Sequence, residues 1–309
     1  MLCINIIKNN VNIIEAERPE INQAHEAIVM VTTTTISERD RFFQINSKSS
    51  SFVPGSEFAG YIVEIGSDVS KFDINDLVIN NSKLEDNKDL FFGTTKLPGG
   101  HAEYVKVPYA DKSLVKITPA IEERAVLLGG DYLSGFYTLE NFKQNFSNFN
   151  SFIVYGFYNS TIAAIHSLKN QSNIQIFAIE KNLKKNKIFK NLVIEIFYSK
   201  IPKSEVLIVG LIENQNDLIK IIKKNNFKKI IFLEKESAEL FLGKLDLKKN
   251  QVFMSKWATT KEIKILIQKL LTKNIELTSL VSHVIPIQDS INAYDLYKNK
   301  NTTSVLLKP

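Results

Sequence analysis

The stretch Val53-Pro-Gly-Ser-Glu-Phe-Ala-Gly-Tyr-Ile-Val-Glu-Ile-Gly-Ser-Asp68 sets the pattern of the first part of the chain. A Pro-Gly turn leads into a run over 59–66, and this run ends at the turn pair Ser67-Asp68. A short apolar run bounded by turn residues on both sides is typical of a β-strand. We therefore predict a strand over 59–66.

Runs of the same kind lie on both sides of this strand, up to about residue 120. Each run is short and ends at turn residues, and their spacing predicts a small β-barrel. The other expected strands are an N-terminal edge strand over 1–8 and strands over 27–31, 77–80 and 102–108.

Near residue 122 the pattern changes to alternating strands and helices. Short buried strands separated by helices predict a doubly wound parallel sheet. The expected strands are 151–155, 174–179, 205–209 and 229–233, and the expected helices are 122–128, 133–142, 161–168, 217–224 and 261–272. Residues 275–309 return to mixed strand and helix signals.

Composition is that of an ordinary globular protein, with 309 residues, 44% of them hydrophobic and 23% charged. This length allows two domains with cores of their own. No apolar run reaches the roughly 18 residues of a transmembrane helix, so we expect no membrane partner. The N-terminus lacks the layout of a signal peptide, and the single Cys3 permits no intramolecular disulfide, so we expect a cytoplasmic protein.

The net charge of +6 does not by itself indicate a nucleic-acid partner. Lysines are scattered, apart from two runs at 181–190 and 223–229 that we interpret as solvated helix faces. No nucleic-acid-binding motif accompanies them, so we expect no nucleic acid as a partner.

The order of the segments resembles the medium-chain dehydrogenase/reductase superfamily, which includes zinc-type alcohol dehydrogenases and zinc-free quinone reductases. Val53-Pro-Gly-Ser-Glu-Phe-Ala-Gly60 is similar to the family's Pro-Gly-His-Glu-x-x-Gly turn, and Gly99-Gly-His-Ala-Glu-Tyr-Val-Lys-Val-Pro108 resembles its "GGxAEYxxVP" strand. The remaining similar segments are 63–69 with 71–78, and the closing segments 280–286, 293–294 and 305–309. The resemblance covers nearly the whole chain.

This resemblance implies an α/β protein with two domains. A GroES-like β-barrel domain, over 1–122 and 275–309, would hold a small-molecule substrate. A Rossmann domain with a doubly wound parallel sheet, over 123–274, would hold NAD(H) or NADP(H). By the same analogy, the edge strand near 252–257 would pair two copies into a homodimer.

The positions where the family carries its catalytic zinc ligands hold Ser37, Ser56 and Asp131. Neutral hydroxyls are poor ligands for zinc, which prefers thiolate, imidazole and carboxylate. The stretch 81–98, where the family's structural zinc lobe lies, contains no cysteine. We therefore predict an enzyme without zinc.

The family's Gly-x-Gly-x-x-Gly cofactor motif is altered. Gly156 keeps the tight turn, but Tyr158 replaces the glycine that lets the backbone approach the pyrophosphate, and Thr161 replaces the third. The start of the following helix can still bind an anion. The expected phosphate-binding residues are Gly156, Phe157, Tyr158, Asn159, Ser160 and Thr161.

Glu180 follows the second strand of the parallel sheet, where an acid accepts the ribose hydroxyls and favours NAD over NADP. Lys181 and Lys184 act against this preference, and an ordinary solvated acid is the alternative for Glu180. Gly210, at the end of the third strand, matches a position close to the cofactor.

Without zinc, other groups must stabilise the negative charge that develops on a substrate oxygen. Ser37 and Ser56 can donate hydroxyl hydrogen bonds, and Arg39 can polarise an oxyanion or bind a substrate carboxylate. Asp131 and Tyr132 can relay a proton, although Asp131 can equally cap the helix that begins near 133. The expected substrate residues are Phe42, Ser56, Glu57 and Phe92, with a place in the core as the alternative for the phenylalanines.

Two functions follow. The first is a zinc-independent NAD(P)H oxidoreductase that acts on a small ketone, enone or quinone-like molecule, with specialised biosynthesis as the expected setting. The second is a non-catalytic member of the same fold that has lost its cofactor and serves as a binding or complex subunit. Glu180, Gly210 and the Pro-Gly-Ser-Glu turn favour the first function, and the altered glycine motif favours the second.

Overall fold

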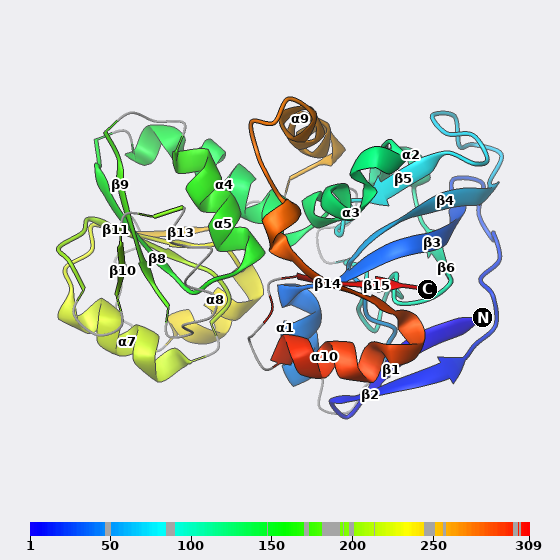
Figure 1. Cartoon of the computed structure of the whole chain (residues 1–309), viewed down its shortest axis with the longest axis horizontal. Helices are drawn as coiled ribbons and strands as arrows, with labels where there is room; N and C mark the ends of the chain where they lie inside the picture. The colour runs from blue at the N-terminus through cyan, green and yellow to red at the C-terminus, as the bar shows by residue number, and fades with distance from the viewer. Residues whose placement is uncertain are drawn as a thin grey trace. The chain divides into compact units, whose positions relative to one another are not determined.

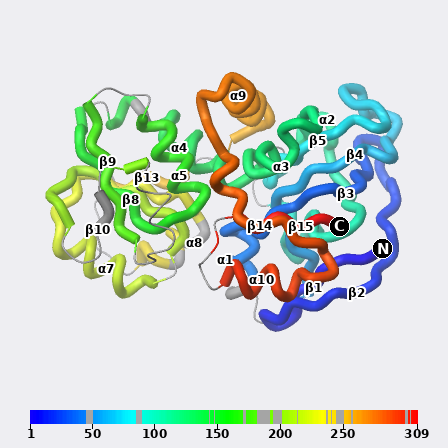
Figure 2. The backbone as a smooth tube through the Cα atoms, in the orientation of Figure 1, coloured from blue at the N-terminus to red at the C-terminus, as the bar shows by residue number. Residues whose placement is uncertain are grey.

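The computed structural model describes residues 1–46, 51–84, 90–146, 148–169, 173–180, 192–193, 195–197, 201–212, 214–243, 251–255, 258–298, 302 and 304–309. By its contacts the chain forms two compact units (Figures 1 and 2). Unit 1 is Met1–Asp131 with Ala258–Pro309, and unit 2 is Tyr132–Trp257. The sequence analysis placed the domain boundaries at 123 and 275. The assignment of substrate binding to one domain and of cofactor binding to the other stays a prediction.

Unit 1 is built on a seven-stranded sheet whose order is β14-β15-β3-β4-β5-β7, with β6 paired to β3. Its strands are β3 (Ala27–Ile36), β4 (Glu57–Ile65), β5 (Leu77–Asn80), β6 (Tyr104–Val107), β7 (Leu114–Lys116), β14 (Val281–Pro286) and β15 (Ser304–Lys308). The predicted strands of this region are confirmed. The closing segment supplies β14 and β15, so the end of the chain completes the sheet that its beginning starts.

The central strand β3 is ten residues long and rich in β-branched side chains, which suit a pleated strand. One edge of β3 pairs antiparallel with β4 along almost its whole length. The other edge is shared, because its first half pairs with β6 and its last residues pair with β15. Strand β3 is therefore long enough to pair with both β6 and the C-terminal strand β15 along the same edge.

The N-terminal strand β1 (Leu2–Ile7) forms an antiparallel hairpin with β2 (Asn10–Glu15). Lys8 and Asn9 make the turn with positive φ angles, which a tight hairpin of two residues requires. The helices of unit 1 are α1 (Glu38–Asn46), α2 (Ala110–Ser113), α3 (Glu122–Ala125), α9 (Thr260–Leu271) and α10 (Ser290–Lys298).

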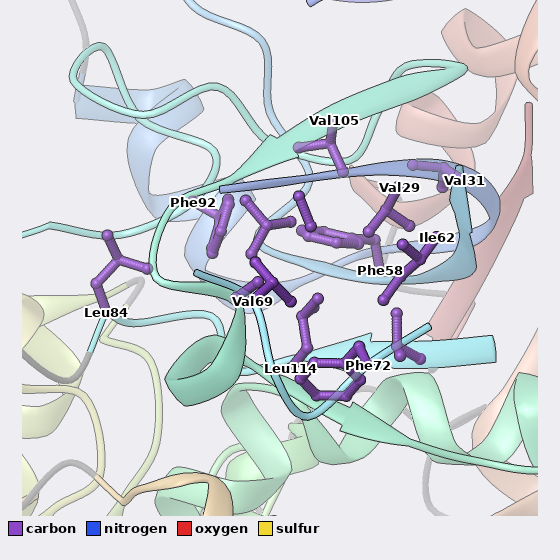
Figure 3. Packing of buried hydrophobic residues seen from close by; sticks show 14 of the residues in the cluster. Val29, Val31, Phe58, Ile62, Val69, Phe72, Leu84, Phe92, Val105 and Leu114 are labelled. Carbon is purple, nitrogen blue, oxygen red and sulfur yellow. The ribbon is translucent and has the colours of Figure 1, made fainter. Parts of the chain in front are cut away.

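A core of valine, leucine and phenylalanine side chains fills the space enclosed by the unit 1 strands (Figure 3). Phe92 is fully buried there, and its ring meets the Phe58 ring edge-on with a centroid distance of 5.2 Å. Edge-to-face contacts of this kind are favourable for aromatic pairs. Phe92 thus occupies the core position that the sequence offered as the alternative to a substrate contact.

Unit 2 is a six-stranded parallel sheet with the order β10-β9-β8-β11-β12-β13. The strands are β8 (Ser151–Tyr155), β9 (Gln175–Ile179), β10 (Glu195–Phe197), β11 (Val206–Val209), β12 (Lys229–Phe232) and β13 (Val252–Met254). The predicted doubly wound sheet is confirmed. The chain runs outward from β8 on one side and from β11 on the other, so the strand order reverses between these two neighbours.

Helices cover both faces of this sheet (Figure 1). They are α4 (Asp131–Phe146), α5 (Asn159–Leu168), α7 (Gln215–Lys224) and α8 (Lys235–Leu242). Helices α7 and α8 pack on one face through Leu218, Ile222 and Phe241. At the end of the described sheet, β13 is the edge strand, and its use for pairing two copies stays a prediction. In the described parts of both units, no helix has the length and apolarity needed to cross a membrane.

The buried position of Phe92 predicts the effect of its removal. Phe92→Ala should lower the free energy of unfolding of unit 1 by about 3–5 kcal/mol, because the deleted ring leaves a cavity. Ile74→Ala is the control, since Ile74 is 54% exposed and its truncation should cost less than about 0.5 kcal/mol. Urea unfolding measures both, and equal losses would contradict the core position of Phe92.

Candidate functional site

The strand register of unit 1 brings two of the predicted site residues together. In the antiparallel pair of β3 and β4, Thr35 lies opposite Glu57. Ser37 directly follows β3 and Ser56 directly precedes β4, so the two serines meet at the same end of the strand pair. Their hydroxyl oxygens are 2.9 Å apart and both side chains are buried.

Asp40 holds this pair in place, and the sequence interpretation missed it. One carboxylate oxygen of Asp40 accepts hydrogen bonds from the Ser37 amide and hydroxyl, at 2.9 and 2.8 Å, and the other accepts from the amides of Gly55 and Ser56. The Asp40 amide in turn donates to the Ser37 hydroxyl. This is a capping box at the start of α1, and the Ser-x-x-Asp spacing in the sequence was its signal.

Glu57 and Asp131 are connected through helix amides. The Glu57 carboxyl accepts a hydrogen bond from the Asp131 amide at 2.6 Å, at the start of α4. The Asp131 carboxylate accepts one from the Glu38 amide at 2.7 Å, at the start of α1. Asp131 therefore caps α1, rather than its own helix as the sequence alternative had it. An acid at a helix N-terminus satisfies an amide that has no partner within the helix.

The charge state of these two acids differs. Burial raises the pKa of Glu57 well above its ordinary value, and the nearby carboxylates of Asp131, Asp40 and Glu38 raise it further. Burial also raises the pKa of Asp131, to about 6, but the Arg39 guanidinium and the Glu38 amide oppose this rise. Neighbouring carboxylates add to the rise at Glu57 whereas Arg39 restrains it at Asp131, so Glu57 holds a proton more readily than Asp131.

Arg39 is the buried cation of this cluster. Its guanidinium carbon lies 4.2 Å from the centre of the Phe91 ring, and its side chain is 3% exposed. The positive charge is close enough to Asp131 to lower the pKa of that carboxyl. A cation over an aromatic face and beside a carboxylate is held in one place. This fixes the guanidinium near the acids.

The residues at the zinc-ligand positions do not fit a zinc ion. Ser37 and Ser56 bond to each other, and the Asp131 carboxylate accepts a helix amide. In the described residues, no group of three or more His, Cys, Asp or Glu side chains is arranged as metal ligands. Two hydroxyls and one carboxylate lack the nitrogen or sulfur that zinc sites use.

A second buried pair, which the sequence interpretation also missed, connects the closing segment to the barrel. The His101 ring bonds to the Thr35 carbonyl through Nε2, at 3.1 Å, and to the Tyr294 hydroxyl through Nδ1, at 2.9 Å. Because Nε2 faces a carbonyl, it carries the proton, and Nδ1 accepts from Tyr294. Burial lowers the pKa of His101, so the ring is neutral.

Two other predicted residues lie elsewhere in their units. The Tyr132 hydroxyl is 2.6 Å from Nδ1 of His166, which joins α4 to α5 within unit 2. Burial raises the pKa of Tyr132 and lowers that of His166 to about 4, so this pair is neutral. Phe42 on α1 is half-buried and meets Phe43 edge-on at 5.6 Å.

The altered glycine motif lies where the strand order of unit 2 reverses. Gly156 follows β8 and Gly210 follows β11, the two strands on either side of the reversal. Ligands of doubly wound sheets bind at this point, outside the carboxyl ends of the strands. The Tyr158 ring lies against both glycines. A Cβ at Gly156 would overlap its Cε2 atom, and a Cβ at Gly210 would lie 2.8 Å from its Cδ2 atom.

The start of α5 is similarly occupied. The Thr161 hydroxyl accepts the Tyr158 amide at 2.9 Å, which uses one of the amides that would face a phosphate. Asn159 and Ser160 are buried. In this conformation the ring covers the two glycines that a pyrophosphate would approach.

Glu180 directly follows β9 and is half-buried. Burial raises the pKa of Tyr155 to about 12, and the charges of Asp217 and Glu180 contribute. Glu180 therefore lies near the carboxyl end of β8, where a ribose-binding acid is expected. Lys181 and Lys184 lie outside the described residues.

Comparison with known proteins agrees with this architecture. The alcohol dehydrogenase GroES-like domain matches residues 23–119. A zinc-type alcohol dehydrogenase B of Aspergillus flavus is 30% identical over 142 residues, which is 40% of this chain. The match spans 33% of that relative's length.

Solved structures extend the likeness to the whole chain. The alcohol dehydrogenase TADH from Thermus sp. ATN1 superposes with a TM-score of 0.80 at 16% identity, over 100% of this chain and 99% of that one. A short chain alcohol dehydrogenase from E. coli CFT073, solved with NADH, gives 0.78 at 19% identity over 100% and 99% of the two chains. The chain thus has a GroES-like domain over residues 23–119 and, over its whole length, the fold of these alcohol dehydrogenases.

Proposed function

We propose that this protein is an oxidoreductase of the alcohol dehydrogenase type that works without zinc on a small ketone, enone or quinone-like substrate. The GroES-like domain and the likeness of both units to alcohol dehydrogenases support an oxidoreductase. The donor set at Ser37, Ser56 and Asp131 supports zinc independence, because its hydroxyls and carboxylate already bind partners within the protein.

The buried Glu57, with one carboxyl oxygen left without a partner, is the observation that carries this proposal. Its Oε2 atom is buried and has no hydrogen-bond partner in the described part of the chain, and the same holds for the Ser82 hydroxyl. The two groups border Gly130, where an added Cβ would overlap Glu57 Oε1 and lie 2.9 Å from Ser82 Oγ. A carboxylic acid kept neutral by an apolar site can donate to an oxygen that gains negative charge.

The roles of the other residues follow from this donor. The carboxylates of Asp131, Asp40 and Glu38 add to the effect of burial in raising the pKa of Glu57, and Arg39 opposes the rise of the pKa of Asp131. Asp40 fixes the two serines, so their hydroxyls cannot turn freely. A nicotinamide dinucleotide supplies the hydride in reactions of this kind. Glu180 suits its adenosine ribose, whereas the crevice at Tyr158 does not receive its phosphates as it stands.

The second candidate function is a non-catalytic protein of the same fold, and the Tyr158 ring favours it. A ring held against Gly156 and Gly210 occupies the place at which the backbone approaches a pyrophosphate. If the ring never leaves, no dinucleotide binds and the protein can only act as a binding or complex subunit.

Nucleotide titration separates these two functions. We expect saturable binding of NADH to the purified protein, tighter than that of NADPH, because the Glu180 carboxylate repels a 2′-phosphate. Glu180→Gln should reduce the preference for NADH. Nicotinamide fluorescence and calorimetry measure both affinities. Absence of binding for either nucleotide at millimolar concentration would favour the non-catalytic function.

The zinc-free mechanism predicts how activity responds to a chelator and to loss of the acid. NADH or NADPH oxidation with a panel of small ketones, enones and quinones should be unchanged by 1,10-phenanthroline. Glu57→Gln should lower kcat by about 10²-fold or more with a smaller effect on KM, since a positioned acid contributes that much. Glu26→Gln is the control, because Glu26 is a buried acid at another place in unit 1. Activity lost with the chelator would disprove zinc independence.

The raised pKa of Glu57 predicts an effect on stability. Glu57 holds its proton more tightly in the folded chain than in the unfolded chain, so the wild type loses stability as the pH rises above the ordinary value of 4.5. Glu57→Gln lacks this loss. Its stability relative to the wild type should rise as the pH increases above about 4.5, by at most about 1.4 kcal/mol per pH unit.

Urea unfolding at several pH values tests this difference. In the matched control Glu26→Gln, the lost carboxylate has partners, since the amides of Asn22 and Gln23 donate to it at 2.8 and 3.0 Å. That variant should gain no stability at high pH. A Glu57→Gln variant whose difference from the wild type is the same at both ends of the pH range would refute a proton on Glu57.

A further inference from the structure

The crevice at the strand reversal of unit 2 contains a side chain of the protein itself. Gly156 has a φ of +85°, a conformation that glycine adopts without strain, and it turns the chain sharply after β8. This turn leads directly to Tyr158, the residue before α5, whose backbone is extended. Because Tyr158 is extended directly after this sharp turn, its ring lies over Gly156.

The contacts of the ring define the space it fills. It touches the position of a Cβ at Gly156 through Cε2 and Cδ2, and that of a Cβ at Gly210 through Cδ2. The Tyr158 ring lies in the space that a side chain at either glycine would take, and beside Gly210 it shares this space with Cγ2 of Thr161. Bare backbone at these two strand ends would otherwise be open to a ligand's diphosphate.

The ring lies at the edge of the interior. Tyr158 is half-buried, whereas Phe157, Asn159 and Ser160 beside it are buried. Three bonds at the start of α5 do not use the ring, because the Thr161 hydroxyl bonds to the amide and carbonyl of residue 158 and to the Gly156 carbonyl. These three bonds do not have to break when the Tyr158 side chain rotates toward solvent.

We propose that Tyr158 is an internal plug of the diphosphate-binding crevice, and that a dinucleotide and the Tyr158 ring occupy it in turn. This inference rests on the proposed function in one respect, since it takes a nicotinamide dinucleotide as the ligand. The affinity of the protein for that ligand then depends on the fraction of molecules in which the ring lies outside the crevice.

The expected size of the effect follows from the population of the open state. An apparent dissociation constant equals the intrinsic one divided by the fraction of molecules that can bind. If the ring is out in roughly a tenth of the molecules or fewer, its removal tightens binding about tenfold or more. The ring competes only with the diphosphate of the ligand. Removal of the ring therefore does not tighten the binding of a ligand that lacks phosphates.

The test compares the wild type with Tyr158→Gly and Tyr158→Phe. Glycine is tolerated at the residue before a helix and removes the ring, whereas phenylalanine keeps the ring and removes only the hydroxyl. Calorimetry measures the binding of NADH, ADP and adenosine to each protein, and circular dichroism and thermal unfolding verify that each variant is folded. We expect Tyr158→Gly to bind NADH and ADP about tenfold or more tightly than the wild type, with adenosine binding unchanged and Tyr158→Phe like the wild type.

The results of this test distinguish failure of the plug from failure of the oxidoreductase proposal. If the wild type binds no NADH and Tyr158→Gly does, the plug is supported and the oxidoreductase proposal fails for the natural chain. If both bind NADH equally, the oxidoreductase proposal stands and the plug is wrong. The plug is also overturned if neither binds, if Tyr158→Phe gains as much as Tyr158→Gly, or if adenosine gains as much as ADP.

Discussion

The antiparallel register of β3 and β4 is the constraint on which the site of unit 1 depends. With Thr35 opposite Glu57, the residues just beyond the strand ends must lie together, and these are Ser37 and Ser56. A shift of one residue would turn every side chain of a strand to the other face and would separate them. The Asp40 carboxylate reinforces this register, because it bonds to the chain on both sides of the pair.

The same geometry explains how buried acids are accommodated in this cluster. Isolated carboxylates are costly to bury, and proteins retain them by hydrogen bonding, by pairing with a cation or by protonation. All three solutions occur in this cluster. Asp40 accepts backbone amides, Asp131 is near Arg39 and caps α1, and Glu57 keeps its proton. Burial is the main cause of the raised pKa of Glu57, and the neighbouring carboxylates add to it.

In unit 2 one side chain lies over the two glycines at the point where the strand order reverses. The parallel sheet, the order reversal and the two glycines at the strand ends are those of a dinucleotide-binding fold. Tyr158 uses the space that these features leave open. A fold is set by many residues of the core, but a ligand site is altered by one ring, so fold and binding are to be tested separately.

The sequence by itself determined the order of the strands and helices, the change from a β-rich part to an alternating part, and the absence of cysteine and histidine at the zinc positions. These features depend on local periodicity and on residue type, which a sequence displays directly. It also flagged Tyr158 as an obstacle, because a ring at a glycine position needs no structure to be noticed. Only the tertiary structure decided that Asp131 caps α1, that Phe92 lies in the core, and that Asp40, which lies three residues after Ser37, organises the loops of two strands. Those facts depend on which distant segments meet. Burial among those segments raises the pKa of Glu57. The packing of β8 beside β11 likewise brings the Tyr158 ring next to Gly210.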